Sequence, residues 1–154
     1  MIYTEMTKKA MRLMIEKHEN QKDKAGMPYF YHPLHVAEQM NDETTTIVAL
    51  LHDIVEDTDT TLDDLRNMNF PKDVLDAIDA LTHKDGVDYY DYIENISKNG
   101  IARKVKIKDL EHNMDLNRLT EITDVDIKRY EKYKRCHDYL LTFEKESVLD
   151  KGVD

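Results

Sequence analysis

Apolar side chains recur at three- and four-residue spacing along most of the chain, which is the spacing of amphipathic α-helices. The pattern predicts a first helix from about Thr4 to Asn20, another that begins at His32-Pro33, and a last one from about Thr123 to Val148. Proline suits the first turn of a helix because its missing N–H would have no partner there. Alternating, strand-like runs are scarce. We therefore expect a single all-α domain of about eight helices, spanning residues 1–154.

The segment from Thr44 to about Glu56 is apolar nearly all round, which is typical of a helix in the centre of a domain. His52 and Asp53 interrupt it side by side, and Glu56 and Asp57 follow. At about 100° per residue, His52, Asp53 and Glu56 share one side of this helix. One interpretation is a helix end that faces water. The other is a metal site, because a divalent cation compensates a buried imidazole and a buried carboxylate at once.

A second polar interruption occurs in the segment IARKVKIKDLEHNMDL, where Asp109 and Asn113 fall on the same stripe as Val105 and Leu116. A surface location does not explain a polar pair on the side that faces the core. An internal hydrogen bond explains it, and so does a metal.

Two imidazoles and two carboxylates from three helices can meet in this arrangement, supplied by His32, His52, Asp53 and Asp109. Mixed nitrogen and oxygen donors without a thiolate suit Mn²⁺, Fe²⁺, Zn²⁺ or Mg²⁺, and they leave coordination positions open for water or substrate. Such a metal lowers the pKa of its water and polarises a phosphoryl oxygen, and a nearby carboxylate can take the proton. Glu56 and Asp57, one turn beyond His52 and Asp53, are placed for that role.

The formal net charge of −10 disfavours binding to a nucleic acid polymer. No apolar run reaches the roughly 18 residues that a membrane span needs, and the N-terminus lacks a signal-peptide pattern, so we expect no membrane association and a cytoplasmic protein. The single cysteine, Cys136, excludes an internal disulfide. An anionic substrate would need local cations, and the basic residues near the motifs are Lys22, Lys24, Lys84, Arg103, Lys104 and Lys108.

Three motifs resemble the HD-domain metal-dependent phosphohydrolases, and within them the hydrolase domain of RelA/SpoT homologues and the small alarmone hydrolases. They are GMPYFYHPLHVA (residues 26–37), VALLHDIVEDTDTTLDDL (residues 48–65) and VKIKDLEHNMDL (residues 105–116). The resemblance implies that one Mn²⁺ is bound by His32, His52, Asp53 and Asp109. It favours His32 over His35, three residues later, as the ligand from its helix.

The same resemblance implies that Glu56 and Asp57 activate or position the attacking water, and that Asn113 belongs to the catalytic set. The implied reaction removes the 3′-pyrophosphate from guanosine tetra- or pentaphosphate and yields GDP or GTP. The implied partner is a small nucleotide, and a homodimer is possible. Synthesis is not expected, because 154 residues leave no room for a second catalytic domain.

Three places depart from the family pattern, and one is the family's Val-Thr-Lys-Leu stretch, which is LTHKDGVDYYDY here (residues 81–92). Asp23 stands where the family usually has an arginine that helps to hold the nucleotide, and Lys108 stands where alanine is usual. The alternatives are therefore a phosphohydrolase of another nucleotide (an adenosine alarmone, a nucleoside monophosphate, a cyclic nucleotide or NADPH) and a metal-containing sensor that binds a nucleotide without cleaving it.

Overall fold

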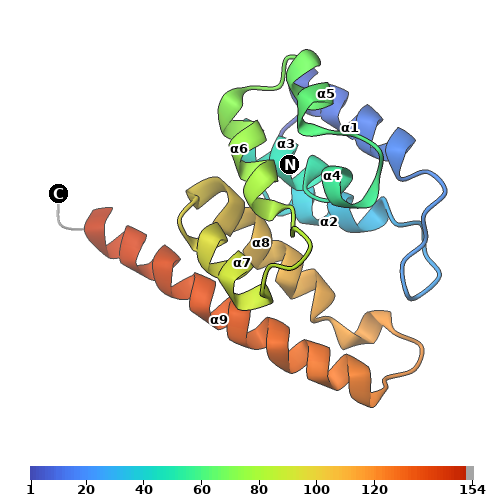
Figure 1. The fold of residues 1–154 in the computed structure, drawn as a ribbon, viewed down its shortest axis with the longest axis vertical. Coiled ribbons are helices and arrows are strands. Elements are labelled where there is room, and N and C mark those ends of the chain that lie inside the picture. Colours follow the sequence, from blue (N-terminus) through green and yellow to red (C-terminus); the bar gives the residue numbers. More distant parts are fainter. Residues whose placement is uncertain (152–154) are drawn as a thin grey trace.

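The protein is described by a computed structural model that covers the backbone of residues 1–151 and the side chains of residues 1–145. This part of the chain forms no β-strand, so the prediction of an all-α domain is confirmed (Figure 1). An isolated bridge between Lys22 and Pro28 closes the loop after the first helix. The helices in the described part are α1 (Glu5–Lys17), α2 (Tyr31–Glu38), α3 (Glu43–Leu51), α4 (Ile54–Asp57), α5 (Leu62–Asn67), α6 (Lys72–Leu81), α7 (Tyr89–Ser97), α8 (Gly100–Asn113), the 3₁₀ helix η1 (Leu116–Arg118) and α9 (Asp124–Lys151).

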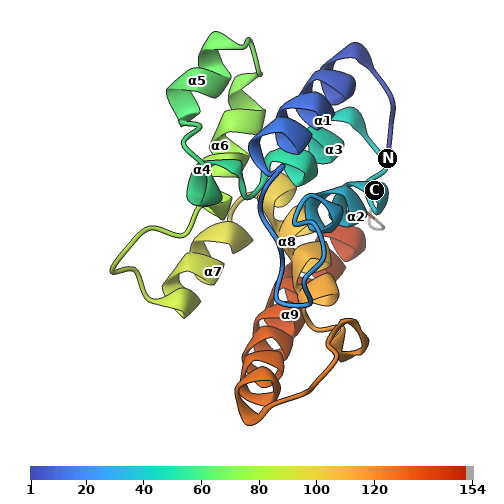
Figure 2. The same cartoon turned by 90° about the vertical axis from the view of Figure 1, so that its right-hand side faces the viewer.

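Helix α3 lies in the centre of the domain, as its apolar sequence predicts. It packs against α1, α2, α6 and α8, and every residue from Thr45 to Leu51 is buried. Figure 2 shows α8 lying between α3 and α9. Because α2, α3 and α8 all pack on one another, polar side chains on their facing sides meet inside the domain.

The predicted central helix from Thr44 to Glu56 is wrong in one respect, because the structure divides it into α3 and α4. The Nδ1–H of His52 donates to the carbonyl oxygen of Ala49 at 2.6 Å. In an uninterrupted helix that carbonyl would accept from the backbone N–H of Asp53. A side chain that enters the helical hydrogen-bond ladder breaks it locally, so His52 and Asp53 form the junction between the two helices.

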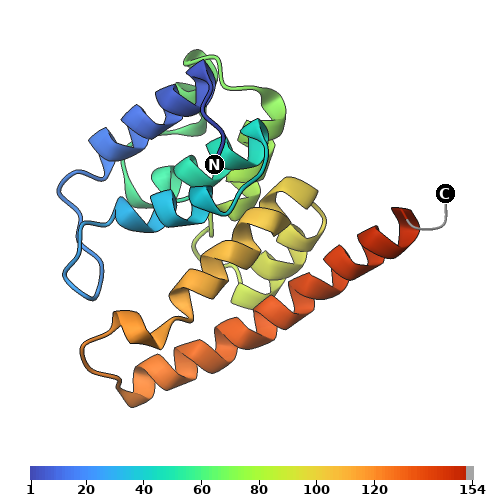
Figure 3. The same ribbon diagram turned by 180° about the vertical axis from the view of Figure 1, so that it is seen from behind.

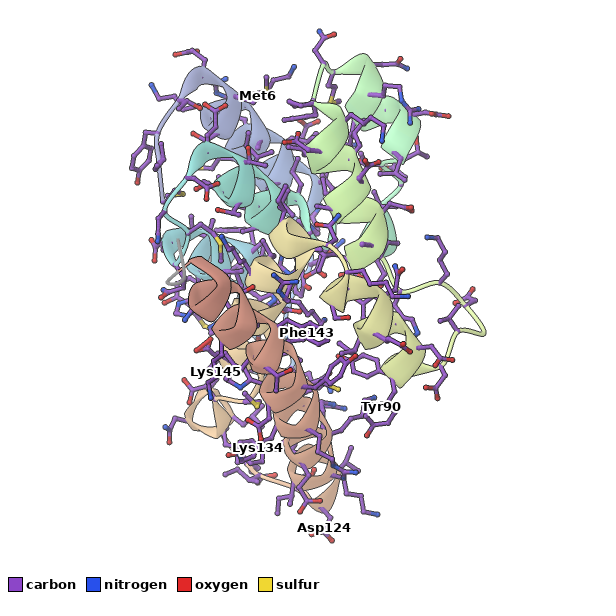
Figure 4. All side chains as sticks on the ribbon, turned by 90° about the vertical axis from the view of Figure 1, so that its left-hand side faces the viewer. Met6, Tyr90, Asp124, Lys134, Phe143 and Lys145 are labelled. Atoms are coloured by element: carbon purple, nitrogen blue, oxygen red, sulfur yellow. The ribbon has the colours of Figure 1, made fainter. Side chains whose placement is uncertain are left out.

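Helix α9 runs along α8 and α7, and Figure 3 shows its far end extending beyond both. In Figure 4, Met6 and Asp124 mark opposite ends of the molecule, and Tyr90 of α7 lies beside α9. Among the α9 side chains that the structure describes, Cys136 and Leu140 are buried and anchor this helix to the core. In the described residues no helix is both long and apolar enough to cross a membrane.

Candidate metal and active site

Four side-chain atoms from α2, α8 and the α3–α4 junction converge in the interior. The Nε2 atom of His32 lies 2.8 Å from Oδ1 of Asp109 and 3.8 Å from Oδ2 of Asp53. The Nε2 atom of His52 lies 3.0 Å from Oδ2 of Asp53 and 3.6 Å from Oδ1 of Asp109. His32, His52 and Asp109 are buried, and Asp53 is nearly so. Two imidazole nitrogens and two carboxylate oxygens thus face one small volume.

This cluster is suited to a divalent metal ion. The Nε2 atom of His52 is buried and, although it is close to Asp53, it has no hydrogen bond of acceptable geometry in the described residues. Its Nδ1 must be the protonated nitrogen, because the Ala49 carbonyl can only accept. A neutral His52 therefore directs an unshared lone pair at the cluster. A metal ion would satisfy that otherwise costly buried atom.

Without a metal, a protonated His52 compensates the charges of the two carboxylates. Burial alone would lower the pKa of His52, but the carboxylates of Asp53 and Asp109 outweigh burial and raise that pKa well above its usual value. Burial alone would raise the pKa of Asp53, but His52 outweighs it and lowers the pKa to about 2. A cation that binds the two carboxylates takes over the compensation that the imidazolium provides.

Asp109 is oriented by a lysine that sequence reasoning did not identify. Lys106, one turn earlier on α8, is buried and donates from Nζ to Oδ2 of Asp109 at 2.7 Å. Burial would raise the pKa of Asp109, but Lys106 outweighs it and holds the pKa well below the usual value. Asn113 donates from Nδ2 to Oδ1 at 3.0 Å. The sequence feature that could have identified Lys106 is its position within one turn of Asp109 on a mostly buried helix.

Glu56 and Asp57 lie beside the cluster, as predicted. One carboxylate oxygen from each lies within 4.8 Å of a carboxylate oxygen of Asp53. Glu56 also accepts from the backbone N–H of His83 at 2.7 Å. Burial raises the pKa of both carboxyl groups, and the charge of Asp53 raises them further. Carboxylates with raised pKa values next to a metal site are suited to accept a proton near neutral pH.

Tyr29 is a further residue of the site. Its hydroxyl donates to Oδ2 of Asp53 in a short hydrogen bond. Burial, followed by the charge of Asp53, raises the pKa of the phenol far above its usual range, so it stays a donor. The tyrosine thus fixes the orientation of one carboxylate, and its ring remains in the wall of the neighbouring cavity.

A cavity of about 290 Å³ opens onto the cluster. It is lined by Lys22, Asp23, Lys24, Ala25, Tyr29, His32, Asn113, Asp115, Leu116, Arg118, Leu119, Asp126, Arg129 and Tyr133. Two of the lysines predicted to contact substrate, Lys22 and Lys24, are therefore beside the site. The proximity of Arg129 adds to burial in lowering the pKa of Lys24, which shows that cations are gathered in this wall.

Two arginines of the cavity were missed from the sequence. Arg118 is the last residue of η1, and its Nη2 lies 3.2 Å from Oδ2 of Asp23, whereas Arg129 comes from α9. Asp23 also accepts from the backbone N–H groups of Ala25 and Met27, which fixes the loop. Arg118, which is distant in sequence, thus contacts Asp23, the residue that replaces the family's usual arginine.

The other four predicted cations lie elsewhere in the structure. Lys84 pairs with Asp79 at 3.0 Å, and Arg103 pairs with Glu144 at 2.6 Å. Lys104 and Lys108 line a different groove, which Asp109 does not line. Nearness in sequence to a motif did not place these side chains near the cluster, because only one face of a helix meets the site.

His35 does not join the metal-binding atoms. Its ring stacks on that of His112, with the ring centroids 4.0 Å apart and the planes 19° apart. His112 in turn lies against His32, with 2.7 Å between the two Nδ1 atoms. Burial, then the proximity of His32 and Arg118, lowers the pKa of His112 to about 3. Of the three histidines, His32 therefore faces the cluster and the other two stand behind it.

Comparison with known proteins agrees with this geometry. A family profile described as HD domain matches residues 10–126. The chain is 39% identical over 84 residues to guanosine-3′,5′-bis(diphosphate) 3′-pyrophosphohydrolase of Aquifex aeolicus, a match that covers 52% of the chain and 12% of that protein. It is 32% identical over 114 residues to the bifunctional (p)ppGpp synthase/hydrolase SpoT of Escherichia coli K12, covering 64% of the chain and 16% of SpoT.

A solved structure is similar over nearly the whole chain. It is described as a metazoan ortholog of SpoT that hydrolyses ppGpp and plays a role in starvation responses. The TM-score is 0.74 at 26% sequence identity, and the match covers 91% of this chain and 88% of the other. The chain thus corresponds to a small part of the long bacterial relatives and to most of the metazoan one.

Proposed function

Because this chain belongs to the HD domain family, we propose that it is a metal-dependent phosphohydrolase that removes the 3′-pyrophosphate from guanosine tetra- or pentaphosphate. The products are GDP or GTP and pyrophosphate. The observation that carries the proposal is the convergence of His32, His52, Asp53 and Asp109 next to a cavity that four basic and three acidic side chains line. The Aquifex relative is named as a hydrolase of this compound and the metazoan neighbour is described as hydrolysing ppGpp, which supports this substrate.

The four converging side chains are the proposed metal ligands, and Mn²⁺ is the proposed ion. Nitrogen and oxygen donors without sulfur suit Mn²⁺, with Fe²⁺, Zn²⁺ and Mg²⁺ as alternatives. When bound, such an ion supplies Lewis acidity toward a phosphoryl oxygen and a lowered pKa of water. Lys106 holds Oδ2 of Asp109, so that Oδ1, which also accepts from Asn113, faces the cluster. Tyr29 donates to Oδ2 of Asp53, the oxygen that faces His52.

Glu56 and Asp57 are the proposed proton acceptors for the attacking water. Their carboxylates lie beside Asp53, and Glu56 is fixed by the backbone N–H of His83. The water attacks the phosphorus atom next to the 3′-oxygen of the ribose, the bond between that phosphorus and the 3′-oxygen breaks, and pyrophosphate is released. The departing 3′-oxygen takes up a proton to become a hydroxyl group, which balances the proton given up by the water. A carboxylate that accepts the proton as the new P–O bond forms lowers the barrier to this step.

The cavity wall supports a nucleotide that carries further phosphate groups. Lys22, Lys24, Arg118 and Arg129 line it, although the whole chain has a formal charge of −10. Charged donors bind phosphate oxygens more strongly than neutral ones do. We assign the substrate-binding role to these four residues, two of which, Arg118 and Arg129, replace the cations that lie elsewhere.

A substrate panel tests the proposal. Purified protein with Mn²⁺ is incubated separately with guanosine tetraphosphate, adenosine tetraphosphate, a nucleoside monophosphate, a cyclic nucleotide and NADPH. The proposal predicts pyrophosphate release from the guanosine compound, and loss of this activity in Asp53→Ala with the helical circular-dichroism spectrum retained. If a different nucleotide alone is hydrolysed, that nucleotide is the substrate. A different nucleotide is the main alternative because the carboxylate of Asp23 lies in the cavity wall. Tight binding of the guanosine compound without turnover would favour a sensor.

A further inference from the structure

His32 makes its two ring contacts with very different partners. Its Nε2 lies 2.8 Å from Oδ1 of Asp109, on the side of the proposed metal, and its Nδ1 lies 2.7 Å from Nδ1 of His112. A hydrogen bond between two imidazole nitrogens needs one proton, so one ring donates and the other accepts. Which ring donates determines whether His32 can be a metal ligand.

The role of His32 fixes the answer. A metal-ligating nitrogen must offer its lone pair, so the proton of a neutral His32 has to be on Nδ1. The Nδ1 of His112 must then be the acceptor, and His112 carries its own proton on Nε2. His52 obtains the same tautomer from a backbone carbonyl, that of Ala49. For His32, the imidazole of His112 takes the place of such a carbonyl as the acceptor.

His112 is held firmly enough for this task. It is buried, the ring of His35 stacks on it at 4.0 Å, and Arg118 donates from Nη1 to its backbone carbonyl at 3.0 Å. It also lies one turn after Asp109 on α8. The same helix therefore supplies one cluster residue directly and supports a second from behind.

We propose that His112 is a positioning residue for the metal site: it accepts the Nδ1–H of His32, and so keeps Nε2 of His32 unprotonated and directed at the metal. The inference rests on the metal site of the proposed function but not on the substrate. Partners behind a metal-ligating histidine typically change metal affinity about 10- to 100-fold when they are removed.

Two variants of nearly equal shape separate the hydrogen bond from packing. In His112→Asn, the amide Oδ1 is attached to Cγ as Nδ1 is, so an acceptor remains at the same place. In His112→Leu, a methyl carbon stands there and accepts nothing. Isothermal titration of the metal-free full chain with Mn²⁺ alone measures affinity without any substrate.

We expect His112→Leu to bind Mn²⁺ about 10- to 100-fold more weakly than the unaltered chain, and His112→Asn to stay within a fewfold of it. Urea unfolding of the metal-free variants shows that both are folded. Equal affinities for all three proteins would overturn the proposal. So would an equal loss in the Asn and Leu variants, because only packing would then be at work.

The unaltered chain offers a second, independent measurement should His112→Leu fail to fold. With Zn²⁺ as a diamagnetic probe, ¹⁵N NMR of the histidine rings reports which nitrogen carries each proton. The proposal requires a proton on Nδ1 of His32 and on Nε2 of His112. Protonated Nδ1 on His112 and unprotonated Nδ1 on His32 would contradict it. Absence of alarmone turnover would not alter either readout, so the two proposals fail separately.

Discussion

Lys106 and Asp109 form a buried ion pair within one turn of α8, with Nζ of the lysine 2.7 Å from Oδ2 of the aspartate. The opposite oxygen, Oδ1, is thereby left to face His32 at 2.8 Å. With Oδ2 engaged by the lysine, Oδ1 is the oxygen that faces the cluster. The ion pair therefore both compensates a buried charge in α8 and orients the carboxylate of Asp109 in the site.

Replacing Lys106 with Met keeps the length of the side chain and removes its charge. We expect the free energy of unfolding of the metal-free protein to fall by about 3 kcal/mol, because the buried carboxylate of Asp109 loses its main partner. Urea titration in the presence of a chelator measures it. Saturating Mn²⁺ should recover part of the loss, since a cation at Oδ1 again compensates the charge.

Lys108→Met is the matched control. Lys108 pairs with Glu111 at 3.2 Å on a partly exposed side of the same helix, so its loss should cost under about 1 kcal/mol. Equal destabilisation by the two substitutions would show that the charge of Lys106 has no special structural role.

Glu56→Gln should separate activity from stability. The amide keeps an acceptor for the N–H of His83 but cannot take a proton, so kcat should fall roughly 100- to 10,000-fold. The metal-free variant should also unfold at a higher temperature than the unaltered chain at neutral pH, because burial and Asp53 raise the pKa of Glu56 and its ionised form is disfavoured in the folded state.

The pH dependence of that gain has a definite sign. Because the pKa of Glu56 is higher in the folded state, protonation of this carboxyl group stabilises the fold. The stabilisation is complete at a pH below the unfolded-state pKa of 4.5, and it is lost as the pH rises through the folded-state pKa. The advantage of Gln over Glu should therefore be largest at neutral pH and vanish as the pH falls below 4.5. Calorimetric scans at several pH values check this, and an advantage that grew with acid would contradict it.

Arg118→Gln should weaken substrate binding more than catalysis. It removes a guanidinium from the cavity and leaves the carboxylate of Asp23 uncompensated there, so KM should rise about tenfold. Asp23→Asn should lower KM, because it frees Arg118 while Oδ1 can still accept from the loop N–H groups. Steady-state kinetics with guanosine tetraphosphate distinguishes the two directions.

Lys104→Gln serves as the control for charge, since Lys104 lines a different groove. It should leave KM unchanged. A rise in KM equal to that of Arg118→Gln would indicate a general effect of net charge rather than contact in the cavity.

Cys136 should report on the docking of α9. Its side chain is 1% exposed, and burial raises the pKa of the thiol, so both access and thiolate formation are suppressed. A thiol reagent such as DTNB should react with it slowly in the folded protein and rapidly in urea. Rapid reaction without denaturant would show that α9 detaches from α7 and α8.

The sequence predicted much of the site because its polar residues interrupt apolar stripes. His52 and Asp53 in a buried segment, and Asp109 on the core side of α8, needed no tertiary information. The break between α3 and α4 was missed because it depends on a side-chain bond to a carbonyl, which hydrophobic periodicity does not report. Arg118 and Arg129 were missed because they reach the cavity from η1 and α9, and only the packing of these elements brings them there.

The product of the reaction tests the central claim most directly. Guanosine tetraphosphate is mixed with the Mn²⁺-loaded protein, the reaction is stopped with excess EDTA to remove the paramagnetic ion from the phosphates, and ³¹P NMR then identifies what is released. We expect GDP and pyrophosphate in equal amounts, with no release when a chelator removes the metal before the substrate is added. Inorganic phosphate in place of pyrophosphate, or no release by protein that has been shown to hold Mn²⁺, would contradict it.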